Sequence, residues 1–371
     1  MSFLEKAWSK RASWLLLLWP LSLIFQFVAA QRKRSLISKQ IPAPTTPVIV
    51  IGNISVGGTG KTPFLIALCK YLQDKGSKPG IISRGYGGQA KEYPFVISAD
   101  SSFAEAGDEP LLIAQRTGCP VITDPDRVSA LNHLLKNFDV DVVLSDDGLQ
   151  HYALPRHIEI CLIDGQQLLG NGLCLPAGFL REPPSRLREV DLIVLNYLSI
   201  QAMEDESELS DSGDEEGSES FFEKQQSANS EALVDSAGVN IANIHSTEVN
   251  PGFLVNLSTG EKRPFLGAPF NMGTQVHCVT GIGNPARFIR LLEQLSYPIT
   301  PHIFPDHHPF TPQDFETLPT ESNQPIVMTE KDGIKCREFA AANFWYLEIN
   351  LEMDPKLLAA IDARLQQVIG D

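Results

Sequence analysis

Short apolar runs bounded by glycine or polar residues recur along the first 200 residues of the chain. They occupy residues 47–52, 80–85, 119–123, 141–147, 158–164 and 191–196. Nearly continuous apolar runs of this length are typical of strands buried on both faces of a parallel sheet. Helical patterns over 62–76 and 126–138 separate several of them, with Pro63 in a first turn and Gly76 at a C-cap. This alternation predicts an α/β fold with a doubly wound, mostly parallel sheet.

The alternation stops after Asn196. Residues 201–240 hold twelve acidic residues and one basic residue, Lys224, so they carry −11 of the net charge of −15. A segment so charged and so poor in apolar residues does not bury a core. We therefore predict a disordered acidic insertion over 201–240, which is either a solvated linker or an acidic arm that binds a partner.

Apolar patterning returns near residue 253 and predicts a second, smaller α/β lobe. A strand followed by a helix is expected within 277–295, and a further strand within 324–336. The chain ends with a predicted strand over 344–354 and an amphipathic helix over 355–369. The predicted organisation is an N-terminal helical region (1–40), a core (41–200), the insertion (201–240) and the smaller lobe with its closing helix (241–371).

The segment VIVIGNISVGGTGKTP, residues 48–63, combines a strand, a glycine-rich turn and a helix start. It matches the phosphate-binding loop G-x-x-x-x-G-K-[ST], except that Ser55 stands in the first glycine position. Backbone N–H groups would point into one concavity, Lys61 would reach the phosphates of ATP, and the Thr62 hydroxyl would hold Mg²⁺. Because residue 55 has none of these tasks, Ser55 weakens the match more than the chemistry. The predicted nucleotide-binding residues are Ser55, Val56, Gly57, Gly58, Thr59, Gly60, Lys61 and Thr62.

An uncharged run of 20 residues lies between Arg11 and Arg32. A helix of this length is about 30 Å long, which is enough to cross a bilayer. A cleavable signal peptide is the competing interpretation, because basic residues precede the run and small residues end it. Retention at the cytosolic face of a membrane is favoured, since a site for a cytosolic nucleotide follows shortly after. Spanning the bilayer and lying in its interface both remain open.

Composition excludes other classes of protein. Outside the acidic segment the net charge is only −4, and no strongly basic domain is present, which argues against a nucleic-acid partner. The six cysteines lack C-x-x-C or zinc-type spacing and are expected to be reduced core residues.

Acidic residues and histidines supply further candidate chemistry. Asp146 and Asp147 follow an apolar strand, where an acid would meet Mg²⁺ or its water shell; an Asp-Gly turn is the alternative. Asp108 and Glu109 of the GDEP segment fit the first turn of a helix. A histidine pair follows Asp306 and is consistent with acid–base chemistry, a metal site or a surface loop.

Nine motifs occur in a fixed order: GNISVGGTGKTP, SRGYGG, GDEP, DPDR, SDDGLQH, LPAGFLREP, VTGIGNPARF, FPDHH and TEKD. With this set, the sequence resembles the tetraacyldisaccharide 4'-kinase family, the lipid A kinases of Gram-negative bacteria, over roughly residues 14–350 apart from the insertion. The resemblance implies ATP-dependent phosphorylation of the 4'-hydroxyl of an acylated glucosamine disaccharide 1-phosphate. It also implies a lipid partner, Mg²⁺, and an N-terminal helix at the cytoplasmic face of the bacterial inner membrane. That family accepts Ser or Thr where Ser55 stands.

The same resemblance implies roles for individual residues. Asp108 is similar to the family's catalytic base, and a histidine of FPDHH is similar to its partner; we assign His307 and keep His308 as the alternative. The implied metal ligands are Thr62, Glu109, Asp146 and Asp147. The implied contacts to substrate or phosphate are Arg127, Gln150 and His151.

Two features depart from the family pattern, and one other function class competes with it. Phe179 replaces the proline usual in LPAGFLREP, and the acidic insertion is additional. The competing hypothesis is a membrane-tethered ATPase switch of the partition type. That group carries a lysine before the glycine pair, where this chain has Val56, which counts against it.

Overall fold

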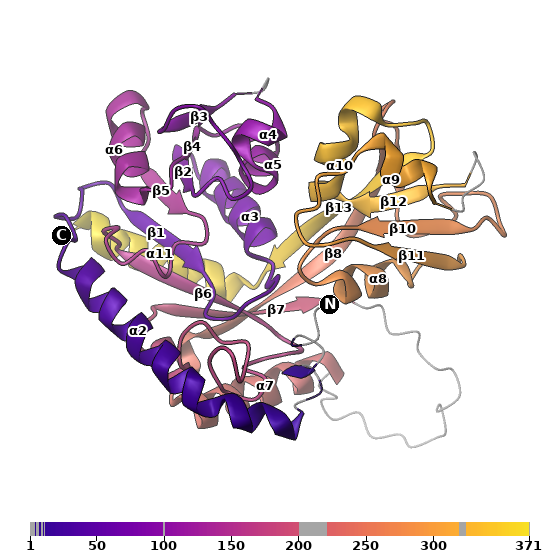
Figure 1. Cartoon of the computed structure of the whole chain (residues 1–371). Coiled ribbons are helices and arrows are strands. Elements are labelled where there is room, and N and C mark those ends of the chain that lie inside the picture. The colour runs from indigo at the N-terminus through magenta and orange to yellow at the C-terminus, as the bar shows by residue number, and fades with distance from the viewer. Residues whose placement is uncertain are drawn as a thin grey trace, which may run out of the picture.

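One mixed sheet runs through the whole molecule and connects two lobes (Figure 1). The computed structural model describes residues 12–98, 101–199, 221–318 and 324–370, together with Leu4, Ala7, Trp8 and Lys10. Within these residues the strand order is β11-β10-β12-β13-β8-β7-β6-β1-β5-β2-β4-β3, with β9 paired to β8.

The first lobe contains the strands that the sequence pattern predicts. They are β1 (Val48–Gly52), β2 (Pro79–Ser83), β4 (Val121–Thr123), β5 (Val142–Ser145), β6 (Ile158–Asp164) and β7 (Leu192–Leu198), all parallel to their neighbours in this group. The short antiparallel edge strand β3 (Phe95–Ile97) was not predicted. Successive residues of β1 enter opposite cores, Val48 and Val50 on one face and Ile49 and Ile51 on the other. Both faces are buried, which explains why these strands are apolar throughout.

Helices cover both faces of this half of the sheet. Their bounds are α3 (Lys61–Asp74), α4 (Phe103–Ala106), α5 (Asp108–Thr117) and α6 (Arg127–Asn137), with the short 3₁₀ segment η2 (Pro184–Arg188). The predicted helices over 62–76 and 126–138 are thus confirmed. Residues from α3 and α5 pack in one core and residues from α6 in the other, as a doubly wound fold requires.

The second lobe extends the same sheet. It contains β9 (Lys262–Pro264), β10 (Val276–Thr280), β11 (Ile299–Ile303) and β12 (Ile326–Thr329), with α8 (Pro285–Leu292), α9 (Pro312–Glu316), α10 (Glu330–Cys336) and η4 (Arg337–Phe339). The long strands β8 (Ile244–Asn256) and β13 (Phe344–Met353) pair antiparallel and carry the sheet from one lobe into the other. The lobes therefore share a continuous backbone ladder.

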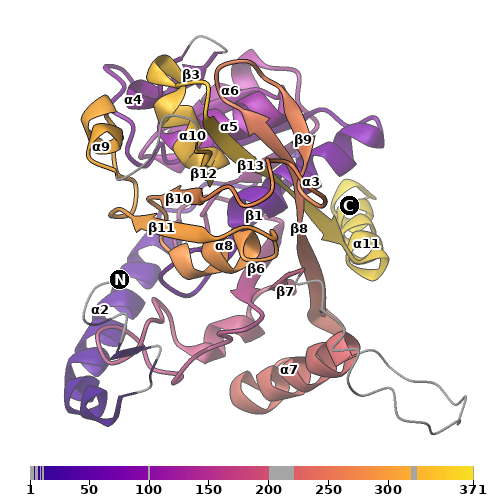
Figure 2. The same ribbon diagram turned by 90° about the vertical axis from the view of Figure 1, so that its right-hand side faces the viewer.

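Two expectations about the boundary between the lobes are wrong. The insertion was expected to be disordered over 201–240, yet Phe221–Ala237 forms helix α7, followed by η3 (Ile241–Asn243). Leu233 and Ala237 are each 1% exposed in the core of the first lobe, and α7 is the crossover between parallel strands β7 and β8 (Figure 2). Residues 200–220, which hold most of the acidic residues, lie outside the described part of the chain.

The closing helix α11 (Pro355–Gly370) is the second correction, because it packs on the first lobe rather than the second. Leu357, Ile361 and Leu365, spaced four residues apart, lie in the same core as β1 and α3. The chain therefore returns to the first lobe through β13.

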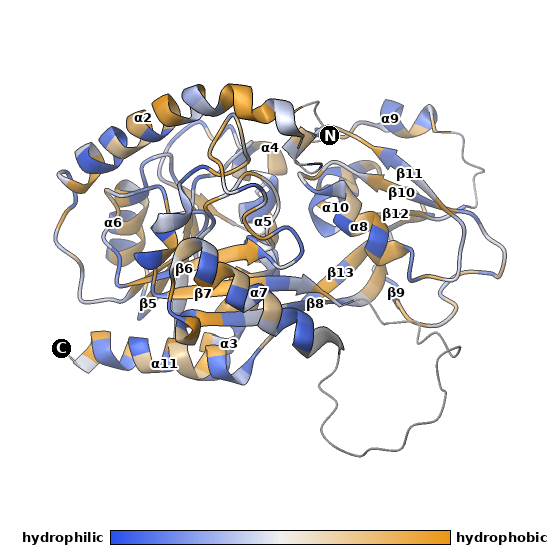
Figure 3. Ribbon diagram, turned by 90° about the horizontal axis from the view of Figure 1, so that it is seen from below, coloured by the Kyte–Doolittle hydropathy of each residue, from blue (hydrophilic) through white to orange (hydrophobic). Residues whose placement is uncertain are grey.

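The uncharged N-terminal run forms η1 (Ser13–Leu18) and α2 (Trp19–Ile37), which lie along the outside of the first lobe. Hydrophobic residues dominate the N-terminal half of α2 and polar residues its C-terminal half (Figure 3). Residues Ser13–Ile37 are long and apolar enough to cross a membrane by length and composition, and only a small share of them is buried by protein.

Candidate active site

A cavity of about 1090 Å³ lies between the two lobes and α2. It exceeds the usual 300–1,000 Å³ of small-molecule sites and opens at the carboxyl ends of the parallel strands, where α/β proteins bind ligands. Most of the predicted site residues line it, namely Val56, Gly57, Gly58, Gly60, Lys61, Thr62, Asp108, Glu109, Arg127, Asp146, Asp147, Gln150, His151 and His307. Ser55, Thr59 and His308 do not.

The glycine-rich loop takes its shape from two residues with positive φ and from a buried asparagine. Gly57 has φ 107° and Gly60 has φ 84°, in the region that favours glycine. Asn196 at the end of β7 donates from Nδ2 to the Thr59 carbonyl at 2.8 Å. A Cβ atom on Gly60 would lie 1.8 Å from that nitrogen, so only glycine fits there.

Ser55 has a structural role in the same loop. It is 7% exposed, accepts a hydrogen bond from Asn53 Nδ2 at 3.4 Å, and forms a bridge with Leu180. The neighbouring Val56 N–H donates to the Phe179 carbonyl at 2.8 Å. The segment with the unusual Phe179 thus supports the loop through backbone atoms, which any residue at 179 supplies.

Lys61 and the two adjacent aspartates meet across the carboxyl ends of β1 and β5. Lys61 Nζ lies 3.5 Å from Asp147 Oδ1, and Arg181 lies 3.4 Å from Asp147 Oδ2. Burial would raise the pKa of Asp147, but these two cations outweigh it and lower the pKa. Asp146 accepts from Ser83 Oγ at 3.0 Å, and burial, with Glu109 and Asp147 nearby, raises its pKa to about 6.

These residues fit a magnesium ion that is bound together with phosphate. Asp146 Oδ1 is buried and accepts no hydrogen bond, and Asp147 Oδ1 is in the same situation. Nowhere in the described ranges do three His, Cys, Asp or Glu residues gather closely enough to hold a metal by themselves. Mg²⁺ at nucleotide sites takes one or two carboxylates and completes its shell with phosphate oxygens and water.

Asp108 and His307 form a hydrogen-bonded pair across the two lobes. Asp108 is the first residue of α5, and His307 follows β11 with φ 57°. His307 Nδ1 lies 3.0 Å from Asp108 Oδ2. This hydrogen bond raises the pKa of His307. Burial would raise the pKa of Asp108, but the hydrogen bond with His307 and the charges of Lys335 and Lys331 hold it well below its usual range.

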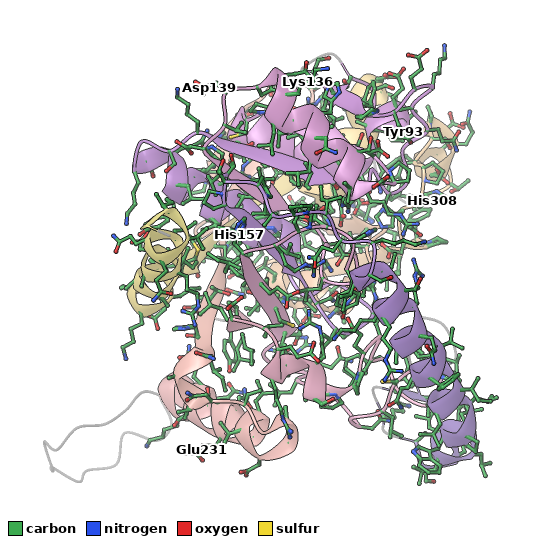
Figure 4. The ribbon with its side chains drawn as sticks, turned by 90° about the vertical axis from the view of Figure 1, so that its left-hand side faces the viewer. Tyr93, Lys136, Asp139, His157, Glu231 and His308 are labelled. Carbon is green, nitrogen blue, oxygen red and sulfur yellow. The ribbon has the colours of Figure 1, made fainter. Side chains whose placement is uncertain are left out.

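His308 points away from this pair. Its Nε2 lies 3.1 Å from Asp314 Oδ2 at the start of α9, and its ring packs against Phe304 and Phe310. Figure 4 labels it on the second lobe. Of the two adjacent histidines, the geometry therefore brings only His307 to the carboxylate.

A family model described as "Tetraacyldisaccharide-1-P 4'-kinase" matches residues 14–366. The chain belongs to this family. It is 41% identical over 375 residues to a tetraacyldisaccharide 4'-kinase of Pseudomonas aeruginosa, with 100% of each chain covered. It is 38% identical to that of Hahella chejuensis, covering 99% of this chain and 98% of the relative. It matches a crystal structure of the "apo" form of LpxK from Aquifex aeolicus in complex with ATP with a TM-score of 0.66 and 25% identity, over 96% of this chain and 99% of that chain.

In this member of the kinase family, the other predicted polar residues line the same cavity and have distinct partners. Arg127 is 2% exposed and donates to the carbonyls of Asp124 and Asp146 at 3.2 and 2.9 Å, so it holds the turn that carries the aspartates. Gln150 donates to the Asn53 carbonyl at 2.9 Å and to Glu182 at 2.7 Å. Burial, together with Arg127 and Arg84, lowers the pKa of His151 to about 4, which leaves a neutral imidazole at the cavity wall.

Sequence reasoning missed two residues at this site that connect the lobes, Lys331 and Arg287. Lys331 of α10 forms an ion pair with Glu109, which was expected to be a metal ligand. Arg287 of α8 bonds Asp164 at 3.2 Å and the Tyr197 carbonyl at 3.1 Å, and so joins the second lobe to the first. Both residues lie in motifs that the sequence analysis singled out, Lys331 in TEKD and Arg287 in VTGIGNPARF. A motif, however, does not reveal that its residue contacts the other lobe.

Proposed function

We propose that this protein transfers the γ-phosphoryl group of ATP to the 4'-hydroxyl of tetraacyldisaccharide 1-phosphate and so forms lipid IVA. The observation that carries the proposal is the position of the Asp108–His307 pair, on the wall of the cavity that also holds Lys61 and the two aspartates. An acceptor hydroxyl and a nucleotide phosphate therefore have adjacent sites in one cavity.

In the proposed reaction the loop 55–62 and the N-terminus of α3 bind the phosphates, and Lys61 neutralises their charge. Thr62, Glu109, Asp146 and Asp147 are the residues that would hold Mg²⁺, which offsets the charge of the phosphate oxygens. For Glu109 this requires Lys331 to leave its carboxylate. Arg127 fixes the aspartate turn, while Gln150 and His151 face the substrate.

The proton of the acceptor hydroxyl passes to the Asp108–His307 pair as the oxygen forms its bond to the γ-phosphorus and the bond to the ADP oxygen breaks. A sugar hydroxyl is a poor nucleophile, so a base at hydrogen-bond distance orients it and removes the proton late. Positioning and neutralisation of charge supply most of the rate acceleration.

We further propose that α2 lies in the interface of the inner membrane, at its cytoplasmic face. Its outer surface exposes large apolar side chains, among them Phe27 (64%), Ile24 (60%) and Val28 (58%). The opposite side is held by protein: Ser22 Oγ donates to the Cys174 carbonyl at 2.8 Å, and Lys33 forms an ion pair with Glu189. A helix fastened to the lobe near both ends does not cross the bilayer, and its basic C-terminal half suits lipid headgroups.

The test is transfer of labelled γ-phosphate from ATP to tetraacyldisaccharide 1-phosphate in detergent micelles. Labelled lipid is expected with the unaltered protein and not with Lys61→Ala or Asp108→Ala. Release of phosphate without labelled lipid would contradict the proposal and favour a nucleotide-hydrolysing switch.

A further inference from the structure

Lys335 lies between two carboxylates, one of which, that of Asp108, lines the cavity. Its Nζ lies 3.1 Å from Asp108 Oδ2 and 3.2 Å from Asp332 Oδ1. The Lys335 side chain is only 3% exposed. A buried ammonium group is costly unless carboxylates pair with it, so both partners are needed to keep this lysine in place.

Asp332 has ample partners of its own. It is completely buried and accepts hydrogen bonds from Thr329 Oγ1 at 2.7 Å and from the Gly281 N–H at 3.1 Å. The Gly281 carbonyl in turn accepts from the His307 N–H at 3.0 Å. One short network thus fixes Lys335 on α10 and the backbone of His307 in the same lobe.

We propose that Lys335 is a positioning residue for the kinase reaction: it fixes the orientation of the Asp108 carboxylate and so keeps it paired with His307. The inference rests on the proposed role of Asp108 as the base. Lys335 acts through Asp108, because its ammonium group is enclosed between the two carboxylates and the ring of Phe310, 5.8 Å away.

The division of contacts at the Asp108 carboxylate supports this role. Lys335 binds Oδ2, the Glu109 N–H donates to Oδ1 at 2.9 Å, and His307 Nδ1 lies within 3.2 Å of both oxygens. The carboxylate is thus held from its own helix, from α10 and from the loop after β11. Loss of Lys335 removes the contact from α10 and leaves the carboxylate held only by its own helix and by His307.

Other charged and titratable groups surround this carboxylate. Those on the packed elements are Glu109 on α5, Asp306 and His307 after β11, Lys331, Asp332 and Lys335 on α10, and Asp146 after β5. Among the cations, Lys331 is paired with Glu109, so Lys335 is the lysine in direct contact with Asp108.

Removal of this contact has a defined kinetic effect. Lys335 holds Asp108 Oδ2 at 3.1 Å and is not among the residues that line the cavity, so its loss disturbs the orientation of the base without removing a contact to ATP. A misaligned base slows the chemical step and leaves the binding of ATP in place. The loss in Lys335→Met should therefore appear in kcat and not in KM for ATP.

The experiment compares Lys335→Met and Lys335→Arg with the unaltered protein, in the lipid-phosphorylation assay at neutral pH. We expect Lys335→Met to lose about tenfold or more in kcat, with KM for ATP nearly unchanged. Lys335→Arg, which retains the charge and an N–H donor toward Asp108, should recover most of the lost kcat. Lys78→Met removes a lysine whose partner is the exposed Asp139, and serves as the matched control.

The outcomes separate this inference from the proposed function. An unchanged kcat in Lys335→Met, with Asp108→Ala inactive, would overturn the role of Lys335 alone. Full activity of Asp108→Ala would overturn the proposed base. If Lys335→Met fails to fold by thermal denaturation, Lys335→Arg and Lys335→Gln supply the comparison, and equal kcat values in these two would count against the inference.

Discussion

His307 Nδ1 lies 3.0 Å from Asp108 Oδ2, although 199 residues separate the two along the chain. One residue begins a helix of the first lobe, and the other lies in a loop of the second. The pair therefore exists only when β8 and β13 hold the two lobes in this arrangement.

Replacement of the Asp108 carboxylate should lower turnover and leave nucleotide binding nearly unchanged. Asp108→Ala is expected to lower kcat by roughly 10²–10⁴, the usual contribution of a general base. Because the glycine-rich loop and Lys61, and not Asp108, are the proposed contacts to the phosphates, stabilisation of the protein by ATP in thermal denaturation should persist. Turnover within a few fold of the unaltered enzyme would refute the assignment, and Asp139→Ala, a surface change, is its control.

The ionisation of His307 should depend on the same contact. The hydrogen bond with Asp108 raises the pKa of His307 in the folded protein. The interaction therefore contributes its full stabilisation of the folded state at pH values below about 6.5, the pKa of histidine in the unfolded chain. This stabilisation is lost as the pH rises through the higher pKa of the folded state. Asp108→Asn should lower the His307 pKa, as measured by the NMR titration of its ring proton.

The difference in stability between the unaltered protein and Asp108→Asn should accordingly be larger at pH 5.5 than at pH 9. The carboxylate itself does not change this sign, because its own pKa is held low and it stays ionised over that range. A difference that grows with pH would contradict the pairing. His308→Gln should leave the titration of His307 unchanged, since His308 faces Asp314.

Gly60 offers a test of the phosphate-binding loop. Gly60→Ala should abolish ATP binding and destabilise the protein, because the new Cβ would lie 1.8 Å from Asn196 Nδ2. Gly76→Ala is the matched control: its φ is also positive, at 87°, but nothing lies within 4 Å of a Cβ there, so only about 1–2 kcal/mol of backbone strain is expected. Chemical denaturation measures the stability of the two variants, and titration with ATP measures their nucleotide binding.

The double variant Gly60→Ala, Asn196→Ala isolates the collision. Truncation of Asn196 makes room for the new methyl group, so the double variant should be less destabilised than the two single changes together. If the loss of stability in the double variant equals the sum of the losses in the two single variants, backbone strain, and not the contact with Asn196, explains the need for glycine.

The part of this site that the sequence could predict is the part whose residues are contiguous. The loop 55–62 has a spacing set by local backbone geometry, and apolar runs mark the six parallel strands of the first lobe because both faces of these strands are buried. The contact of Asn196 with Thr59 spans 137 residues and has no local signal. Lys335 was missed for a similar reason, since α10 is two turns long and contains Gly333, which weakens a helical pattern.

The error in α7 has a different cause. Nine of the twelve acidic residues of 201–240 precede residue 221. Because the prediction treated the charge and composition of 201–240 as a whole, it overlooked the helical spacing of Leu233 and Ala237 and the Gly238 that follows them. Glu231 lies on the exposed side of this helix (Figure 4). The amphipathic pattern was thus present in the sequence, but only over its last two turns.

The exposed face of α2 should determine binding to membranes. Ile24→Gln and Phe27→Gln change side chains of α2 that are 60% and 64% exposed and lie outside the contacts that hold α2 to the lobe. Each is expected to weaken binding to vesicles by about tenfold or more, since burial of such a side chain contributes roughly 1.5–3 kcal/mol. Met272→Gln, which alters a side chain 93% exposed on the second lobe, should bind vesicles as the unaltered protein does. Co-sedimentation with vesicles of neutral and anionic lipid measures these changes, and equal binding by all three variants would exclude α2 as the membrane contact.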